Sequence, residues 1–222
     1  YVDIRLNNDL IRPGGLMGLF SIGGSLTFRE NHALASLTGL EGLTTVGGDL
    51  NIRENVSLTS LTGLDGLATI GGTLTIEQNY WLGTLTGLDN LTSIGGSLYI
   101  GTGFVSSGNP SLTSMAGLDG LTSIGGRLYV RNNISLESME GLEGLTTIDG
   151  SLTINHNNSI VSLAGLEGLT TIGGGLAIVE NNSLASLTGL DNVTSIGGDI
   201  SIKNNNALTS LTGLDNLASI GD

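Results

Sequence analysis

The chain of 222 residues contains no cysteine and few basic residues, and both absences exclude classes of protein. Without cysteine, neither disulfide bonds nor thiolate metal sites hold the fold together. Only 7 lysines and arginines stand against 20 aspartates and glutamates, which gives a formal net charge of −13. Proteins bind nucleic acid by neutralising phosphates with Lys and Arg, so nucleic acid is a poor partner for this chain.

Long apolar runs and catalytic residue sets are missing as well. No stretch approaches the roughly 20 apolar residues of a transmembrane helix, so this segment is not expected to insert into a membrane. The two histidines, His32 and His156, lie five repeats apart, or about 24 Å at the spacing of paired strands, which excludes a catalytic dyad. No glycine-rich stretch matches a phosphate-binding loop. The sequence therefore predicts a protein that is not an enzyme and has no cofactor.

Glycine is abundant, and its 37 copies follow a long period. Aligning the chain on its Ile-Gly-Gly motif gives nine copies of one unit, with a spacing of 24 residues except once, where it is 30. Position 1 of the unit is occupied by Ile22, Val46, Ile70, Ile94, Ile124, Ile148, Ile172, Ile196 and Ile220. A fixed period of this length indicates a repeat architecture.

The pattern within one copy predicts a coil with three short sides. Positions 5 and 7 are apolar, as in Leu26 and Phe28, an alternation typical of a short half-buried strand. Positions 13, 16, 19 and 22 are apolar too, but the glycine at position 18 of every copy, such as Gly39, argues against a helix. The predicted fold class is all-β: a right-handed, β-helix-like leucine-rich solenoid of nine coils with little helix, forming a single unit over residues 1–222.

Position 10 is asparagine in all nine copies. A buried amide needs hydrogen-bond partners, so we expect these residues to stack in a ladder that bonds to turn backbone and to the amides above and below. The ladder comprises Asn7, Asn31, Asn55, Asn79, Asn109, Asn133, Asn157, Asn181 and Asn205. Because a single ligand site would not need nine copies, the ladder is interpreted as structural.

Residues 26–34, LTFRENHAL, fit the Leu-x-Leu/Ile-x-x-Asn-x-x-Leu core of leucine-rich repeats. The whole unit, L-x-x-L-x-x-I-x-G-x-L-x-I-x-x-N, resembles the L domains of the insulin and epidermal growth factor receptors and their bacterial surface-protein relatives. The resemblance covers essentially the entire chain and implies an extracellular or cell-surface recognition or scaffold module. Receptor L domains carry cysteines and coils of varied length, which this chain lacks, so neither hormone binding nor any functional residue is carried over.

A six-residue insertion within residues 101–110 interrupts the array, and five of the eight aromatic residues gather near it. Exposed Tyr and Trp beside Arg suit contacts with a glycan or a protein. The candidate ligand-binding residues are Tyr80, Trp81, Tyr99, Phe104, Arg127, Tyr129 and Arg131. The alternative is that aromatic pairs such as Tyr99 and Tyr129 only stabilise a sheet.

Position 20 holds a carboxylate in eight copies. Neighbouring carboxylates about 5 Å apart in water repel by only about 0.8 kcal/mol, so we interpret the column as solvated turn caps. A weaker hypothesis is a calcium site, because acidic oxygens are the ligands that calcium prefers. Its candidate residues are Asp65, Asp89 and Asp119.

Three functions remain open at this point. The first is a non-enzymatic extracellular module of a larger cell-surface or secreted protein, mediating adhesion or recognition of a glycan or protein. The second is a structural solenoid that associates with itself end to end into a fibre or surface layer, because the chain from Tyr1 spans whole coils and is expected to be a piece of a longer one. The third is ice binding by hydroxyl columns such as Ser36 and Thr38, although Ala116, Glu140 and Ala164 interrupt them.

Overall fold

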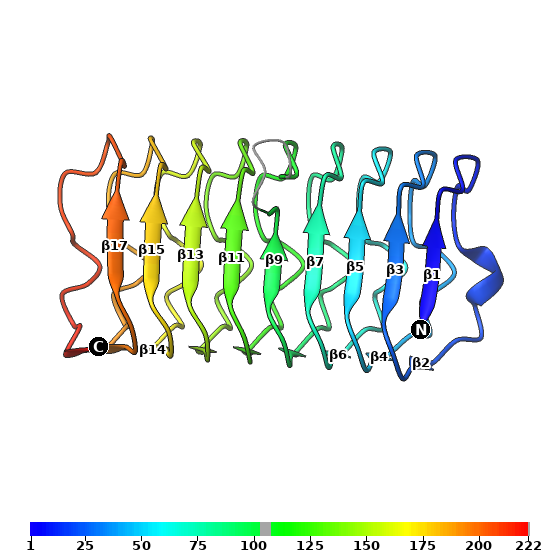
Figure 1. Ribbon diagram of the computed structural model, residues 1–222, viewed down its shortest axis with the longest axis horizontal. Helices are drawn as coiled ribbons and strands as arrows, with labels where there is room; N and C mark the ends of the chain where they lie inside the picture. Colours follow the sequence, from blue (N-terminus) through cyan, green and yellow to red (C-terminus); the bar gives the residue numbers. More distant parts are fainter. Residues whose placement is uncertain (103–107, 222) are drawn as a thin grey trace.

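The computed structural model describes residues 1–102 and 108–221, and these residues form a parallel β-solenoid of about nine coils of ~24 residues. Its coils lie side by side along the long axis of the molecule (Figure 1). A 3₁₀ turn at Gly14–Leu16 is the only helical element in the described part of the chain. No helix in that part is long and apolar enough to span a membrane. The predicted all-β solenoid is confirmed.

Two parallel sheets of nine strands each run the length of the solenoid. The long-strand sheet consists of β1 (Val2–Arg5), β3 (Leu26–Arg29), β5 (Leu50–Arg53), β7 (Leu74–Glu77), β9 (Leu98–Ile100), β11 (Leu128–Arg131), β13 (Leu152–Asn155), β15 (Leu176–Val179) and β17 (Ile200–Lys203). The short-strand sheet consists of β2 (Ser21–Ile22), β4 (Thr45–Val46), β6 (Thr69–Ile70), β8 (Ser93–Ile94), β10 (Ser123–Ile124), β12 (Thr147–Ile148), β14 (Thr171–Ile172), β16 (Ser195–Ile196) and β18 (Ser219–Ile220).

Each strand pairs with the equivalent strand of the next coil. The register places Leu26 opposite Leu50, and it is kept across the insertion, where Tyr99 lies opposite Tyr129. In Figure 1 the chain runs up the long strands at the front and returns behind them as it advances from β1 to β17, so the coils are right-handed. The insertion therefore adds residues to one coil without shifting its neighbours.

Among the described residues, the third side of each coil has no strand and consists of turns. Its leucines still point inward, and Leu37 and Leu40 are fully buried. The backbone N–H of Leu37 donates to the carbonyl of Thr62 in the next coil, at 3.0 Å. Gly63 has a φ of +110°, and a Cβ there would lie 2.1 Å from the Leu37 carbonyl oxygen. The glycine at position 18 therefore allows adjacent coils to approach closely on a side that is not extended.

The asparagine column forms a continuous hydrogen-bonded ladder inside the solenoid. Asn133 is completely buried, and its backbone N–H donates to the Oδ1 of Asn157 at 2.9 Å. Its Nδ2 donates to the carbonyls of Ile100 and Arg131, at 2.9 and 3.0 Å. The ladder thus satisfies the backbone at the corner that follows each long strand.

Candidate binding surface on the long-strand sheet

The outer face of the long-strand sheet is built by the alternation of strand side chains. In β11, Leu128 and Val130 are fully buried in the core. Arg127, Tyr129 and Arg131 alternate with them and point outward, with successive Cα atoms of this set about 7 Å apart. The core residues of one strand therefore fix the direction of three chemically distinct outward side chains.

Tyr99 of β9 and Tyr129 of β11 contact each other on this face. They are register partners, and their ring centroids lie 5.7 Å apart with an interplanar angle of 56°. The Nη1 of Arg131 donates a hydrogen bond to the Tyr129 hydroxyl at 3.2 Å. We refer to Tyr99, Arg127, Tyr129 and Arg131 as the tyrosine–arginine cluster.

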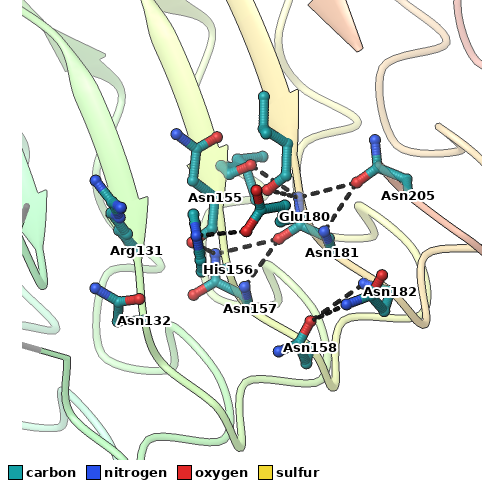
Figure 2. A network of polar contacts seen from close by, with 12 residues as sticks. Arg131, Asn132, Asn155, His156, Asn157, Asn158, Glu180, Asn181, Asn182 and Asn205 are labelled. Atoms are coloured by element: carbon teal, nitrogen blue, oxygen red, sulfur yellow. Dashed lines mark hydrogen bonds and ion pairs between the residues drawn. The ribbon is translucent and has the colours of Figure 1, made fainter. Parts of the chain in front are cut away.

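Polar atoms that lack partners in the described chain lie beside the cluster. On one side Gly101 is in close backbone contact with Arg131, because a Cβ there would lie 2.1 Å from the Arg131 carbonyl oxygen. On the other side Asn155 of β13 is the register partner of Arg131 (Figure 2). Arg131 Nε and Asn155 Oδ1 are shielded from solvent and have no hydrogen-bond partner among the described residues. Polar hydrogen-bonding capacity therefore remains unused at the edge of the cluster.

Charge is distributed unevenly over the same face. Every basic residue except Arg12 lies at an outward position of a long strand or just before one. In the first coils these cations are paired: Arg5 with Asp3 at 3.1 Å, Arg29 with Glu30 and Glu54 at 2.9 and 3.1 Å, and Arg53 with Glu77 at 3.0 Å. In the described part of the chain, neither Arg127 nor Arg131 forms an ion pair with a carboxylate. The centre of the face thus carries uncompensated positive charge.

A shallow cavity of about 270 Å³ lies over the first coils of this face. Its walls include Arg5, Arg29 and Arg53, together with Tyr1 and Asn51. The arginines in these walls are the ion-paired ones. The cavity is therefore less suited to a charged ligand than the tyrosine–arginine cluster is.

The other residues predicted for the ligand site lie elsewhere. Tyr80 and Trp81 belong to the turn that follows β7, beyond the end of the strand, and Trp81 is 68% exposed. The ring contact between Tyr99 and Tyr129 does not extend to them. Phe104 lies outside the described residues. The structure therefore brings Tyr99, Tyr129 and Arg131 into contact and separates Tyr80 and Trp81 from them.

The carboxylates at position 20 accept hydrogen bonds from the glycine two residues earlier. The distances from the glycine N to the carboxylate oxygen are 2.7 Å at Asp65, 2.8 Å at Asp89 and 2.9 Å at Asp119. The backbone N–H groups of Gly39 and of Glu41 itself lower the pKa of the Glu41 carboxyl. Within residues 1–102 and 108–221, no three His, Asp or Glu side chains gather in a group that could hold a metal ion. The column has the geometry of a turn cap.

The serine and threonine columns on the third side contain paired hydroxyls. Ser36 and Thr38 are 3.0 Å apart at their oxygens, and Ser60 and Thr62 show the same distance. In the middle coils the partner hydroxyl is missing, and Ser138 instead accepts a hydrogen bond from the backbone of Glu140. The hydroxyls that the ice-binding hypothesis needs are therefore engaged with each other or with the backbone.

Two polar features beside the ladder were not identified from the sequence, and Figure 2 shows the pair of His156 and Glu180 and the contact between Asn158 and Asn182. His156 Nε2 lies 2.6 Å from Glu180 Oε2. An exposed column of Asn158, Asn182 and Asn206 runs parallel to the ladder, with Nδ2 to Oδ1 distances of 2.9 and 2.7 Å. Asparagine at position 11 of the last three copies is the sequence signal for this column.

The fold defines this chain as a parallel β-solenoid with one aromatic and cationic cluster on the outer face of its long-strand sheet. Comparisons with family models, curated proteins and solved structures gave no match. The function is therefore inferred from the surface of the molecule.

Proposed function

We propose that this chain is a non-enzymatic extracellular recognition module, which binds a glycan or a protein through the tyrosine–arginine cluster. The observation that carries the proposal is that Tyr129 contacts both Tyr99 and Arg131 on the outer face of the long-strand sheet. The resemblance of the repeat to receptor L domains and bacterial surface-protein relatives supports an extracellular location and an adhesive role within a larger protein.

The physical basis of the proposal is the low entropic cost of ordering these residues when a ligand binds. Tyrosine offers a flat apolar face and a polar tip with few rotatable bonds, and Arg is likewise enriched among the residues that dominate binding energy. Tyr99 and Tyr129 stand on strands whose inward residues, such as Leu98 and Leu128, are completely buried. Ligand binding therefore requires little ordering of the backbone.

Capture on an array of immobilised glycans and peptides tests the proposal. We expect the wild-type chain to retain ligands that the double variant Tyr99→Ser/Tyr129→Ser does not retain. Trp81→Ser is the matched control, because it removes an exposed aromatic residue from the turn instead of the cluster. Equal capture by the double variant and the wild-type chain would reject the cluster as the binding surface.

A second candidate function is end-to-end association into a fibre or layer. Each ladder step joins the backbone N–H of one asparagine to the Oδ1 of the asparagine in the next coil. Because this step repeats from coil to coil, the coils of a second copy can continue the ladder in the same way.

Electron microscopy and light scattering at increasing concentration test this second function. Filaments are expected for the wild-type chain and not for Leu211→Lys, which places a charge on the last coil, where Leu211 is 56% exposed. Val161→Lys, at a lateral residue that is 54% exposed, is the matched control and should still form filaments. Single rods at every concentration would exclude this function for the chain.

A further inference from the structure

The tyrosine–arginine cluster is a cationic centre in an acidic protein. The chain has a formal net charge of −13, yet Arg127 and Arg131 have no carboxylate partner in the part of the chain that the structure describes. We propose that the ligand of this cluster is a carboxylate-bearing sugar, such as a uronic or sialic acid unit of an acidic glycan. This inference rests on the proposed recognition function and names its ligand class.

The spacing of the cluster fits a ring that carries a carboxylate. Arg127 and Arg131 are four residues apart along one strand, which places their Cα atoms about 13 Å apart with Tyr129 between them. A sugar ring on the tyrosine pair can therefore direct a carboxylate toward either arginine. The guanidinium group presents a planar set of N–H donors that matches both oxygens of a carboxylate.

The hydrogen-bonding state of Arg131 favours an additional acceptor. Its Nη1 already donates to the Tyr129 hydroxyl, which orients the guanidinium beside the ring. Its Nε has no partner among the described residues. Because Nε is shielded from solvent, a ligand carboxylate would accept hydrogen bonds from the outer guanidinium nitrogens, Nη1 and Nη2.

The acidic residues of the same face do not neutralise the cluster. Glu77, at the end of β7, is separated from β11 by β9, or about 10 Å at the spacing of paired strands. Glu77 is engaged by Arg53, and by Thr102, whose hydroxyl donates to Oε2. Repulsion from more distant carboxylates is screened, because the Debye length is about 8 Å at physiological ionic strength. An anionic sugar therefore meets local positive charge there.

The choice of a sugar over an acidic peptide follows from the tyrosine pair. The rings of Tyr99 and Tyr129 lie 5.7 Å apart and are tilted by 56°, so together they offer a compact apolar surface. A peptide that added a strand would need an exposed sheet edge, but β9 and β11 are paired on both sides. A rigid ring also loses less conformational freedom on binding than a flexible peptide does.

Calorimetry with matched pairs of ligands tests this inference. The ligands are oligogalacturonates and sialylated oligosaccharides, each compared with its carboxyl-reduced counterpart, in which the carboxylate becomes a hydroxymethyl group. We expect at least one acidic ligand to bind roughly tenfold or more tightly than its reduced form, as for a charge-assisted hydrogen bond. Arg127→Gln/Arg131→Gln should remove this preference. Arg5→Gln/Arg29→Gln is the matched control, because it changes the net charge by the same amount on the same face. This variant should still prefer the acidic ligand.

The outcomes separate this inference from the proposed function. Equal binding of acidic and reduced ligands, lost in Tyr99→Ser/Tyr129→Ser, would overturn the acidic ligand class and leave glycan recognition standing. Binding of a polyglutamate peptide as tight as that of the best acidic sugar would overturn the sugar class. If none of these ligands binds, the inference is rejected, while the glycan and peptide array decides separately whether the cluster recognises another molecule.

Discussion

The backbone N–H of Asn109 donates to the Oδ1 of Asn133 at 2.9 Å, and the same oxygen accepts the Asn109 Nδ2 at 3.2 Å. Asn109 follows the insertion, and its own Oδ1 accepts the backbone N–H of Asn79 at 3.2 Å. The ladder therefore continues through the one irregular coil. This continuity holds the coil that carries Tyr99 in register with the coil that carries Tyr129.

Replacing Asn133 tests how much the ladder contributes to stability. In Asn133→Ala, the Asn109 N–H loses its acceptor and the Ile100 carbonyl loses the Asn133 Nδ2 donor, both inside the solenoid. A buried N–H left without a partner costs about 1–3 kcal/mol, and each further hydrogen bond lost costs about 0.5–1.5 kcal/mol, so we expect the free energy of unfolding to fall by roughly 2–5 kcal/mol. Urea denaturation of the purified chain measures this loss.

Asn158→Ala is the matched control, since it removes an asparagine from the exposed parallel column. Surface substitutions usually change the free energy of unfolding by less than about 0.5 kcal/mol. If both variants lose the same free energy of unfolding, the buried ladder stabilises the fold no more than the exposed column does.

The glycine at position 18 is expected to tolerate no side chain in a coil that packs against a preceding coil, as at Gly141. Gly141 has a φ of +105°, and a Cβ there would lie 2.3 Å from the Met115 carbonyl oxygen. Gly141→Ala should therefore lower the free energy of unfolding by about 2 kcal/mol or more, through backbone strain and the separation of two coils. Gly23→Ala, where no atom lies within 4 Å of the added Cβ, should be nearly neutral. Two variants of equal stability would contradict this interpretation of position 18.

The cap at Glu41 predicts a local pH dependence. Hydrogen bonds from the backbone N–H groups of Gly39 and Glu41 lower the pKa of the Glu41 carboxyl below its usual value of 4.5. The stabilisation by this carboxylate is therefore complete above that usual pKa and is lost as the pH falls through the lower pKa of the folded state. An NMR titration of Glu41 measures that pKa, and a midpoint at or above 4.5 would rule out the cap.

Calcium is expected to leave the stability of the chain unchanged. Asp65, Asp89 and Asp119 each accept a hydrogen bond from a glycine N–H, and carboxylates alone do not define a coordination sphere. Thermal melting is compared in a chelator and with added calcium. The midpoint of thermal unfolding is predicted to be the same in both conditions. A higher midpoint with calcium would support a calcium site.

Regularity made most of the fold predictable from the sequence. The period gives the number of coils, and the apolar residues at positions 5 and 7 mark the long strands, such as Leu74 and Ile76 in β7. The turns on the third side were less evident, because leucines spaced by three, such as Leu37 and Leu40, are equally compatible with other short extended sides. Hydrogen bonds to the next coil determine which of these conformations forms. These bonds join two coils, so they cannot be predicted from the sequence of a single repeat.

The left-handed residue at position 9 was not predicted. Glu54, Gln78 and His156 have φ values of 56°, 56° and 59°, although their side chains share no charge or shape. The conformation is held by bonds to the next coil, such as Glu54 N to Glu77 O at 3.1 Å. The sequence signal for this conformation is the absence of β-branched residues from position 9 in every copy. Such residues strongly disfavour positive φ.

The candidate site was located only in part from the sequence. Proximity along the chain grouped Tyr80 and Trp81 with Tyr99 and Tyr129, whereas their repeat positions separate them. Tyr99 and Tyr129 occupy an outward strand position, and Tyr80 and Trp81 follow the asparagine corner. The hydrogen bond from Arg131 to Tyr129 depends on side-chain rotamers, which spacing does not specify.

The most direct test of the recognition surface is an NMR titration of the isotope-labelled chain with a ligand captured on the array. The proposal predicts that the ring signals of Tyr99 and Tyr129 and the guanidinium signals of Arg131 change with ligand concentration, while the indole signal of Trp81 stays constant. Changes at Trp81 or in the end coils, with none at the tyrosine–arginine cluster, would contradict it.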